Sequence, residues 1–327
     1  MTQHIDPAAV GGIRHGTRLR RSTTMGVSPE AQAFAEFLAS VSAKSSTPGL
    51  DLAVIRDIVD SNHKASTEPE GVTYAEVDAG GVPALWAIPE GADPDRALLH
   101  FHFGGSVAAS MHSDRKAAGH IAKAAGARSL VVDFRLAPEH PYPAQLDDAE
   151  TAYRWLLAQG YEPQNIGSTG HSIGGTLAVM LPLRLLAKGE ATPGAIVSVS
   201  PWTDLTLRNP AVDANETNDK MLSRSTLELF RGAWLQDPAV DFTDPQISLV
   251  HADLTGLPPT LVYYGEYETL ADDGAQLGRR LADFKVTTET HAMPEGQHSF
   301  ILGAGRVPEV DQAIGQMGQW LRQHLGA

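Results

Sequence analysis

The chain alternates short apolar runs with longer stretches in which apolar residues recur at helical spacing. The apolar runs show little polar alternation, which is typical of strands buried on both faces of a parallel sheet. The expected strands are residues 97–101, 130–134, 165–169, 195–200, 261–264 and 286–291. The helices expected between and after them are residues 114–125, 145–158, 173–187, 272–284 and 309–324. This order predicts an α/β fold with a mostly parallel central sheet flanked by helices.

Three segments depart from that alternation. Residues 72–88 resemble two strands joined through Gly80-Gly81, which is a hairpin signal. Residues 29–41 have the spacing of an amphipathic helix. Residues 203–247 are polar and then helical at 223–234, and we expect them to form an insertion that covers one edge of the sheet.

Composition narrows the possible chemistry. The chain of 327 residues is 42% hydrophobic and 20% charged, as expected for a folded globular protein. It contains no cysteine, which excludes disulfides, thiolate nucleophiles and thiolate-bound metals. The net charge of −14 argues against nucleic acid and anionic membranes as partners and favours a neutral small molecule.

Targeting signals are not evident in the sequence. The most apolar stretch, residues 173–187, is too short to span a bilayer and contains Pro182 and Arg184. The first 21 residues lack an apolar signal-peptide core and carry a cluster of arginines, so we expect a solvated tail. The resulting expectation is a cytoplasmic protein that does not bind membranes.

The segment Gly170-His171-Ser172-Ile173-Gly174 is the strongest chemical signal in the chain. It lies between an expected strand and an expected apolar helix, which is the context of a G-x-S-x-G nucleophile elbow. A sharp strand-to-helix turn crowds its flanking positions and so favours glycine there. It also directs the helix N-terminus toward a developing oxyanion. Because glycine turns before helices are common, the motif alone is only moderately specific.

Three further segments support the prediction of a hydrolase. His102-Phe103-Gly104-Gly105 follows an expected strand and can present backbone N–H groups. Glu268 follows the strand at 261–264, and His298 lies in a loop after the last strand. The order Ser, acid, His is that of the α/β-hydrolases, and the offset of 30 positions from Glu268 to His298 accommodates one helix and one strand. Three other acids, Glu266, Asp272 and Asp273, compete with Glu268 for the acid role.

These motifs resemble those of the hormone-sensitive-lipase-like branch of the α/β-hydrolases, the bacterial family IV esterases. Residues 102–105 are similar to the family's His-Gly-Gly-Gly, and residues 170–175 to its Gly-Asp-Ser-Ala-Gly-Gly. The run Asp-Phe-Arg-Leu-Ala-Pro-Glu-His at 133–140 follows the family's Asp-Tyr-Arg-Leu-Ala-Pro-Glu-His. In that run we expect Arg135 to pair with Glu139. The likeness extends from about residue 72 to the C-terminus.

The resemblance implies a single α/β-hydrolase domain over residues 1–327, with a small helical cap formed by about residues 1–50 and 203–247. It implies Ser172 as nucleophile, His298 as base and Glu268 as the triad acid, where most relatives carry Asp. Gly104, Gly105 and the amide of Ile173 would form the oxyanion hole.

The chain also departs from the family pattern. Phe103 replaces a glycine, His171 stands where an acid is usual, and Ile173 where alanine is usual. These changes bear on substrate preference more than on catalysis. Phe103, Trp202 and Phe300 are candidates for the substrate pocket, and Trp202 and Phe300 could equally belong to the core.

The resulting expectation is a serine carboxylesterase for short- to medium-chain esters, which works through an acyl-enzyme and needs neither cofactor nor metal. A lactone hydrolase with the same triad is an alternative, because ring opening uses the same acyl transfer. A catalytically inactive, ligand-binding hydrolase fold is a second alternative. Homodimerisation through the edge strand at 286–291 occurs among relatives and is a possibility for this chain.

Overall fold

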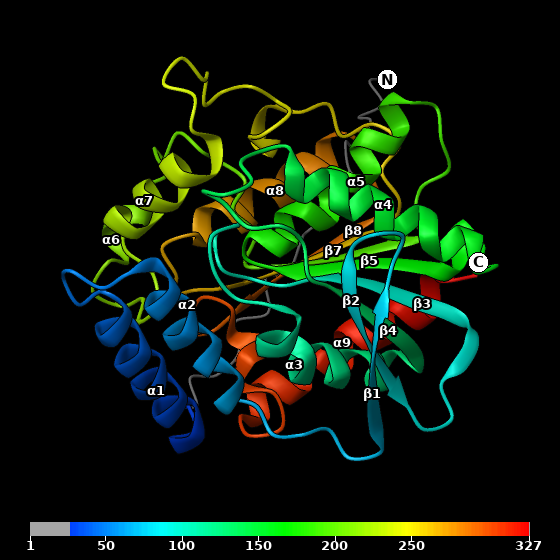
Figure 1. Cartoon of the computed structure of the whole chain (residues 1–327), viewed down its shortest axis with the longest axis horizontal. Coiled ribbons are helices and arrows are strands. Elements are labelled where there is room, and N and C mark those ends of the chain that lie inside the picture. Colours follow the sequence, from blue (N-terminus) through cyan, green and yellow to red (C-terminus); the bar gives the residue numbers. More distant parts are fainter. Residues whose placement is uncertain (1–26, 327) are drawn as a thin grey trace, which may run out of the picture.

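A twisted β-sheet runs through the centre of the molecule, with helices on both of its faces (Figure 1). The computed structural model describes residues 27–326. The strands are β1 Val72–Asp78, β2 Pro83–Pro89, β3 Asp93–Phe101, β4 Ala127–Val132, β5 Ile166–His171, β6 Ala195–Val199, β7 Thr260–Gly265 and β8 Thr288–Met293. They lie in the order β1-β2-β4-β3-β5-β6-β7-β8. Strands β3 to β8 pair in parallel, which confirms the predicted sheet.

Strands β1 and β2 form the predicted hairpin, and β2 joins the parallel strands by antiparallel pairing with β4. The turn between them uses Gly80 and Gly81, with φ angles of 77° and 98° that side chains rarely adopt. The expected strand at 130–134 in fact covers Ala127–Val132, and the one at 286–291 covers Thr288–Met293. At the other end of the sheet β8 is the edge strand.

The helices cover the sheet in two layers: α3 and α9 lie on one face, and α4, α5 and α8 on the other (Figure 1). The helices are α1 Pro29–Ser45, α2 Leu52–Asp60, α3 Met111–Ala125, α4 Ala144–Ala158, α5 Ile173–Ala187, α6 Ala211–Ala214, α7 Arg224–Leu235, α8 Ala271–Asp283 and α9 Pro308–His324. Helix α3 begins at Met111 and not at the expected residue 114, because Ser110 and Ser113 form a capping box at its start. Within residues 27–326, no helix has both the length and the apolar character that crossing a bilayer requires.

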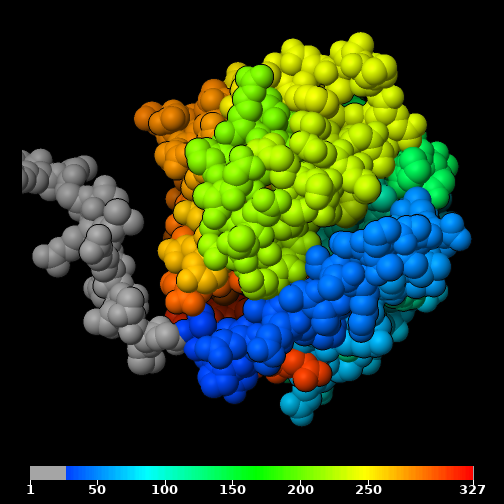
Figure 2. Space-filling model, turned by 90° about the vertical axis from the view of Figure 1, so that its left-hand side faces the viewer, coloured from blue at the N-terminus to red at the C-terminus, as the bar shows by residue number. Residues whose placement is uncertain are grey.

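Helices α1, α2, α6 and α7 lie apart from these two layers, beyond one end of the sheet (Figure 1). Figure 2 shows the α1–α2 segment (blue) and the 203–247 insertion (yellow-green) side by side on one face of the molecule. The Ser42 hydroxyl donates a hydrogen bond to the carbonyl of Met221 across this junction at 3.5 Å. The expected basic tail and the first part of the expected cap, residues 1–26, lie outside the described residues.

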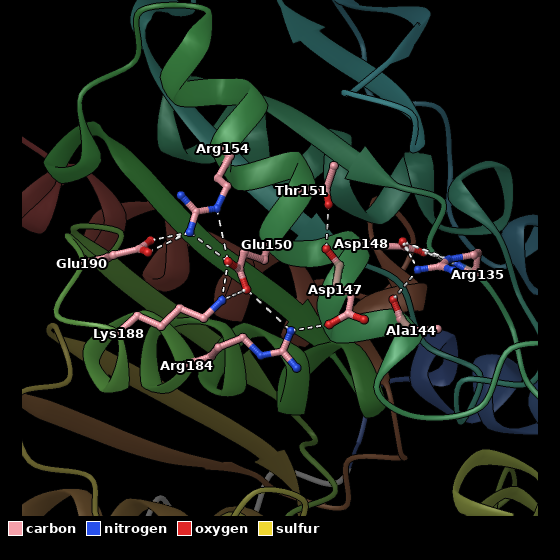
Figure 3. Close-up of polar contacts among 10 residues, drawn as sticks. All are labelled: Arg135, Ala144, Asp147, Asp148, Glu150, Thr151, Arg154, Arg184, Lys188 and Glu190. Atoms are coloured by element: carbon pink, nitrogen blue, oxygen red, sulfur yellow. Dashed lines mark hydrogen bonds and ion pairs between the residues drawn. The ribbon is translucent and has the colours of Figure 1, made fainter.

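The expected pairing of Arg135 with Glu139 is wrong. Arg135 pairs with Asp148 on α4 at 2.8 Å, and Glu139 pairs with Arg56 on α2 at 2.7 Å. Figure 3 shows Arg135 lying against Asp148 and the start of α4. Glu139, four residues further along the chain, instead contacts the α1–α2 segment through Arg56. The run at 133–140 therefore contacts two different helices, α4 through Arg135 and α2 through Glu139.

Helices α4 and α5 are joined by an ion-pair network on the surface (Figure 3). At its centre Glu150, whose side chain is 12% exposed, accepts hydrogen bonds from Arg154 at 2.9 Å and from Lys188 at 2.6 Å. Burial opposes ionisation of Glu150, but the hydrogen bonds from Lys188 and Arg154 outweigh it and hold the pKa of this carboxyl below its ordinary value. A carboxyl with a lowered pKa in the folded state stabilises the fold above its unfolded pKa, and this stabilisation is lost as pH falls.

We therefore expect Glu150→Gln to lower the free energy of unfolding by about 1 kcal/mol at neutral pH, because the network loses its central charge. The difference from wild type should shrink when the pH is brought below the titration of Glu150. Urea unfolding at the two pH values measures both effects. Glu36→Gln, at an exposed position on α1, is the matched control; an equal loss in that variant would contradict a role for the network.

Candidate active site

Ser172 occupies the turn between β5 and α5, with backbone angles φ 57° and ψ −130°. A side chain at Gly170 would overlap the carbonyl of Gly174, and one at Gly174 would overlap the carbonyl of Phe101. The two glycines are thus required by close backbone approach, as the motif predicts. The Ser172 amide donates to the carbonyl of Val199 at 2.9 Å, which helps to hold this strained turn in place.

His298 and Glu268 lie in the loops that follow β8 and β7, and both side chains are buried. Nδ1 of His298 lies 3.0 Å from Oε2 of Glu268, so the ring donates its Nδ1–H to the carboxylate and leaves Nε2 free to accept a proton. The other carboxylate oxygen, Oε1, accepts the Gly265 amide at 3.2 Å. Burial raises the pKa of Glu268, and the hydrogen bond from His298 opposes that rise. One acid thus fixes the orientation of one imidazole.

Of the acids that compete in the sequence, Glu268 is the one within hydrogen-bonding distance of His298 among the described residues. Asp272 and Asp273 instead accept backbone N–H groups of the 203–247 insertion, at 2.8 Å each. Glu266 is exposed and accepts a backbone N–H at 3.4 Å. The tertiary structure therefore distinguishes Glu268, which contacts His298, from the other three acids, which accept backbone N–H groups. Their spacing along the chain does not make this distinction.

The glycine-rich turn after β3 has the backbone conformation that its sequence demands. Gly104 and Gly105 have φ angles of 102° and 63°, and a side chain at Gly104 would overlap the carbonyl of Ala108. His102 lies with Nδ1 2.7 Å from the carbonyl of Phe103 and stacks on the ring of Phe134, with centroids 4.0 Å apart. His102 thus stabilises the glycine-rich turn through these two contacts. Across from it, Ile173 is the first residue of α5, where backbone N–H groups are free of helical partners.

A cavity of about 70 Å³ connects these elements. Its wall combines the turn at Ser172, the glycine-rich turn after β3 and the loop at His298 with side chains of α1, α2 and the insertion. The lining residues are Leu38, Val41, Ser42, Ser45, Ser46, Val59, Asn62, Phe103, Gly104, Gly105, Ser172, Met221, Leu222, Thr226, Phe230 and His298. Of the expected pocket residues, Phe103 lines this cavity, whereas Trp202 and Phe300 lie in the two hydrophobic core clusters.

Phe230 on α7 is a pocket residue that the sequence did not single out. Its ring lies against the glycine-rich turn after β3, since a side chain at Gly105 would overlap it. The only available signal was an aromatic residue on the apolar side of a helix within a polar insertion. The Phe230 ring therefore occupies space in the cavity beside Gly105.

For the ester hydrolysis that the sequence motifs predict, we expect Phe230→Ala to raise kcat/KM for a longer ester relative to an acetate ester by about tenfold, because the ring no longer fills the space beside Gly105. The measurement is the ratio of kcat/KM for p-nitrophenyl octanoate and acetate, with alkyl acetates of different lengths as a second series. Leu229→Ala is the matched control, since Leu229 is on the same helix and 63% exposed. Unchanged ratios in both series would contradict this role of Phe230.

A buried group of possible metal ligands lies beneath the elbow. The ligand atoms of His100, Asp114 and His171 all lie within 4.8 Å of one another. However, Oδ2 of Asp114 already lies 2.9 Å from Nε2 of each histidine, so these atoms are engaged in hydrogen bonds. A cation would have to displace both bonds to bind here. The sequence did not bring these residues together, because Asp114 is 14 residues from His100 and 57 from His171.

Comparison with known proteins identifies a matching family and several similar proteins. A family model described as alpha/beta hydrolase fold matches residues 98–302. The chain is 31% identical to an acetyl-hydrolase of Streptomyces hygroscopicus over 84% of this chain and 97% of the relative. It is 33% identical to an ethyl acetate hydrolase of Pseudomonas putida, over 76% and 80% of the two chains. The crystal structure of an esterase from the bacterial hormone-sensitive lipase family superposes with a TM-score of 0.87 at 34% identity, covering 92% of this chain and 100% of that one.

Proposed function

The chain belongs to the α/β-hydrolase family, in its bacterial hormone-sensitive-lipase-like branch, and from that premise we propose that Ser172, His298 and Glu268 are its catalytic triad. The chain is a carboxylic ester hydrolase, as its relatives are. We propose short- to medium-chain esters as its substrates. The observation that carries the proposal is one cavity onto which both Ser172 and His298 open, with Glu268 hydrogen-bonded to the far side of the imidazole.

The chemistry follows from these positions. Nε2 of His298 takes the Ser172 proton as Oγ attacks the ester carbonyl, while Glu268 stabilises the imidazolium that forms. His298 then protonates the leaving alcohol, which leaves an acyl group on Ser172. A water molecule deprotonated by His298 hydrolyses this acyl-enzyme and regenerates the serine. Each step uses groups of the chain and water.

The oxyanion hole is the second part of the proposal. The amides of Gly104, Gly105 and Ile173 stabilise the negative charge on the carbonyl oxygen of the tetrahedral intermediate. Support comes from the positive φ angles of both glycines and from the position of Ile173 at the N-terminus of α5, where the helix dipole favours negative charge.

The α1 segment and the 203–247 insertion act as a cap on a single α/β-hydrolase domain. Support comes from the cavity wall, to which both segments contribute side chains. Three bonds also couple the insertion to the catalytic loops: Asn215 Nδ2 donates to the Glu268 carbonyl, Asp219 accepts the Thr269 amide, and Gln297 accepts the Lys220 amide. The small size of the cavity, about 70 Å³, supports substrates with a short acyl group over long-chain lipids.

The test is a series of kcat/KM values for p-nitrophenyl esters from acetate to palmitate, with γ- and δ-lactones added, together with labelling by a fluorophosphonate probe. We expect labelling at Ser172 and a maximum among the short to medium esters. A strong preference for lactones would replace the ester proposal with the cyclic-ester alternative. Failure of the probe to label Ser172 would support the inactive, ligand-binding alternative.

A homodimer through edge strand β8 stays a prediction. β8 has a neighbour on one side only, so a second copy could extend the sheet by antiparallel pairing. Light scattering of wild type beside Thr290→Pro tests it. A monomeric wild type would contradict the prediction.

A further inference from the structure

A buried hydrogen-bonded cluster adjoins the turn at Ser172, and the proposed acyl transfer does not use it. His100 on β3, Asp114 in the first turn of α3 and His171 at the end of β5 are all fully buried. Oδ2 of Asp114 lies 2.9 Å from Nε2 of His100 and 2.9 Å from Nε2 of His171. Nδ1 of His100 lies 2.9 Å from Oγ1 of Thr169, which can donate to it. Both imidazoles can therefore present Nε2–H to one carboxylate oxygen.

This arrangement holds a charge in the protein interior. Burial by itself would raise the pKa of Asp114, but the two imidazoles and their hydrogen bonds hold it well below its ordinary value. Burial lowers the pKa of His171. The cluster thus places a carboxylate that favours its ionised form in the first turn of α3, where the helix dipole favours negative charge. Among the described residues, Oδ1 of Asp114 has no hydrogen-bond partner. Because burying a charge that is only partly hydrogen-bonded costs free energy, we do not attribute the presence of Asp114 to stabilisation of the fold.

His171 connects this carboxylate to both halves of the catalytic centre. It directly precedes Ser172, whose strained backbone persists only where its surroundings hold it. Its ring also packs against Phe103, with centroids 5.1 Å apart and the planes at 38°. Phe103 lines the cavity and directly precedes Gly104 of the oxyanion turn. A shift of the His171 ring would therefore move the nucleophile and the oxyanion donors relative to each other.

Resting on the proposed function, we propose that Asp114 is a positioning residue for acyl transfer, which acts through His171 on Ser172 and Phe103. The hydrogen bond from Nε2 of His171 fixes the ring, and the fixed ring is the common support of the elbow and the oxyanion turn. Misplacement of reacting groups by about 1 Å can cost about a hundredfold in rate, so a small rotation of this ring is enough to matter.

The experiment measures kcat and KM for p-nitrophenyl acetate, with kcat expressed per active site counted by fluorophosphonate titration. We expect Asp114→Ala to lower kcat per titrated site about 100-fold with little change in KM, because substrate binding is retained while alignment is lost. Asp114→Asn should keep kcat within about fivefold of wild type, since its one amide oxygen can accept both Nε2–H groups.

A matched control and a second variant keep this test decisive. His100→Leu removes the other donor to Asp114 but leaves the bond to His171, so kcat per site should stay within about threefold of wild type even if the melting temperature falls. His171→Leu should lower kcat per titrated site by about as much as Asp114→Ala does. If Asp114→Ala does not fold, His171→Leu alone tests whether the cluster positions the catalytic groups.

A wild-type kcat per titrated site in Asp114→Ala or His171→Leu, with only the folded fraction reduced, would overturn the proposal by showing a purely structural role. An equal loss of kcat in His100→Leu would also overturn it, because the effect would then not run through His171. If the probe does not label wild-type Ser172, the proposed function itself fails, and that result is distinct from either outcome.

Discussion

Ser172→Ala is expected to lower kcat for p-nitrophenyl acetate by about 10⁵- to 10⁶-fold and to leave the protein folded. In the proposed mechanism the substitution removes the atom that forms the acyl-enzyme, so neither His298 nor the proposed oxyanion amides can compensate. The backbone restraints of the elbow remain, since they come from Gly170, Gly174 and the bond from the Ser172 amide to Val199. Circular dichroism and thermal melting check the fold, and burst kinetics check the loss of the acyl-enzyme.

Ser168→Ala is the matched control for this experiment. Ser168 lies on β5, four residues before Ser172, is fully buried, and donates its hydroxyl to the carbonyl of Ala178 at 2.9 Å. Its loss should cost about 1 kcal/mol of stability and leave kcat per active site unchanged. Ester turnover retained in purified Ser172→Ala would refute Ser172 as the nucleophile.

Glu268→Gln should lower kcat by about 10³- to 10⁴-fold, the range expected when a triad histidine loses its orienting carboxylate. The reason lies in the two donors that Glu268 accepts, Nδ1–H of His298 and the Gly265 amide. A glutamine amide can accept only one of them and must oppose the other with its own N–H. It either misorients the imidazole or forces the tautomer in which Nε2 carries the proton, and it also removes the charge that stabilises the imidazolium.

Two variants sharpen this prediction. Glu268→Asp keeps the charge but is one methylene shorter, so it should retain activity within about tenfold to a hundredfold of wild type. Glu266→Gln, at an exposed acid two residues away, should have wild-type kcat. If Glu268→Gln and Glu266→Gln behave alike, Glu268 is not the triad acid. Fluorophosphonate labelling rates provide a second readout that does not depend on substrate choice.

Local sequence was sufficient for the main elements of the fold. The predicted helix at 173–187 coincides with α5, and the hairpin at Gly80-Gly81 is present, because each depends on periodicity or on glycine turns within one stretch of chain. Boundaries were less accurate where a cap decides them, as at the start of α3. Helix α2 was not predicted at all, and the expected ion pair of Arg135 was assigned to the wrong carboxylate.

The sequence by itself was sufficient to predict the class of fold, the order of its strands and helices, and the segments that carry the proposed catalytic serine, acid and histidine. Those features reside in short motifs, since an elbow needs its glycines and a buried strand its apolar run. Only the tertiary structure decided which acid meets His298, that Phe230 closes the cavity beside Gly105, and that Asp114 joins His100 to His171. These depend on how strands and helices distant in the chain pack together, because a hydrogen bond or a steric contact is fixed by distance in space and not by spacing along the chain.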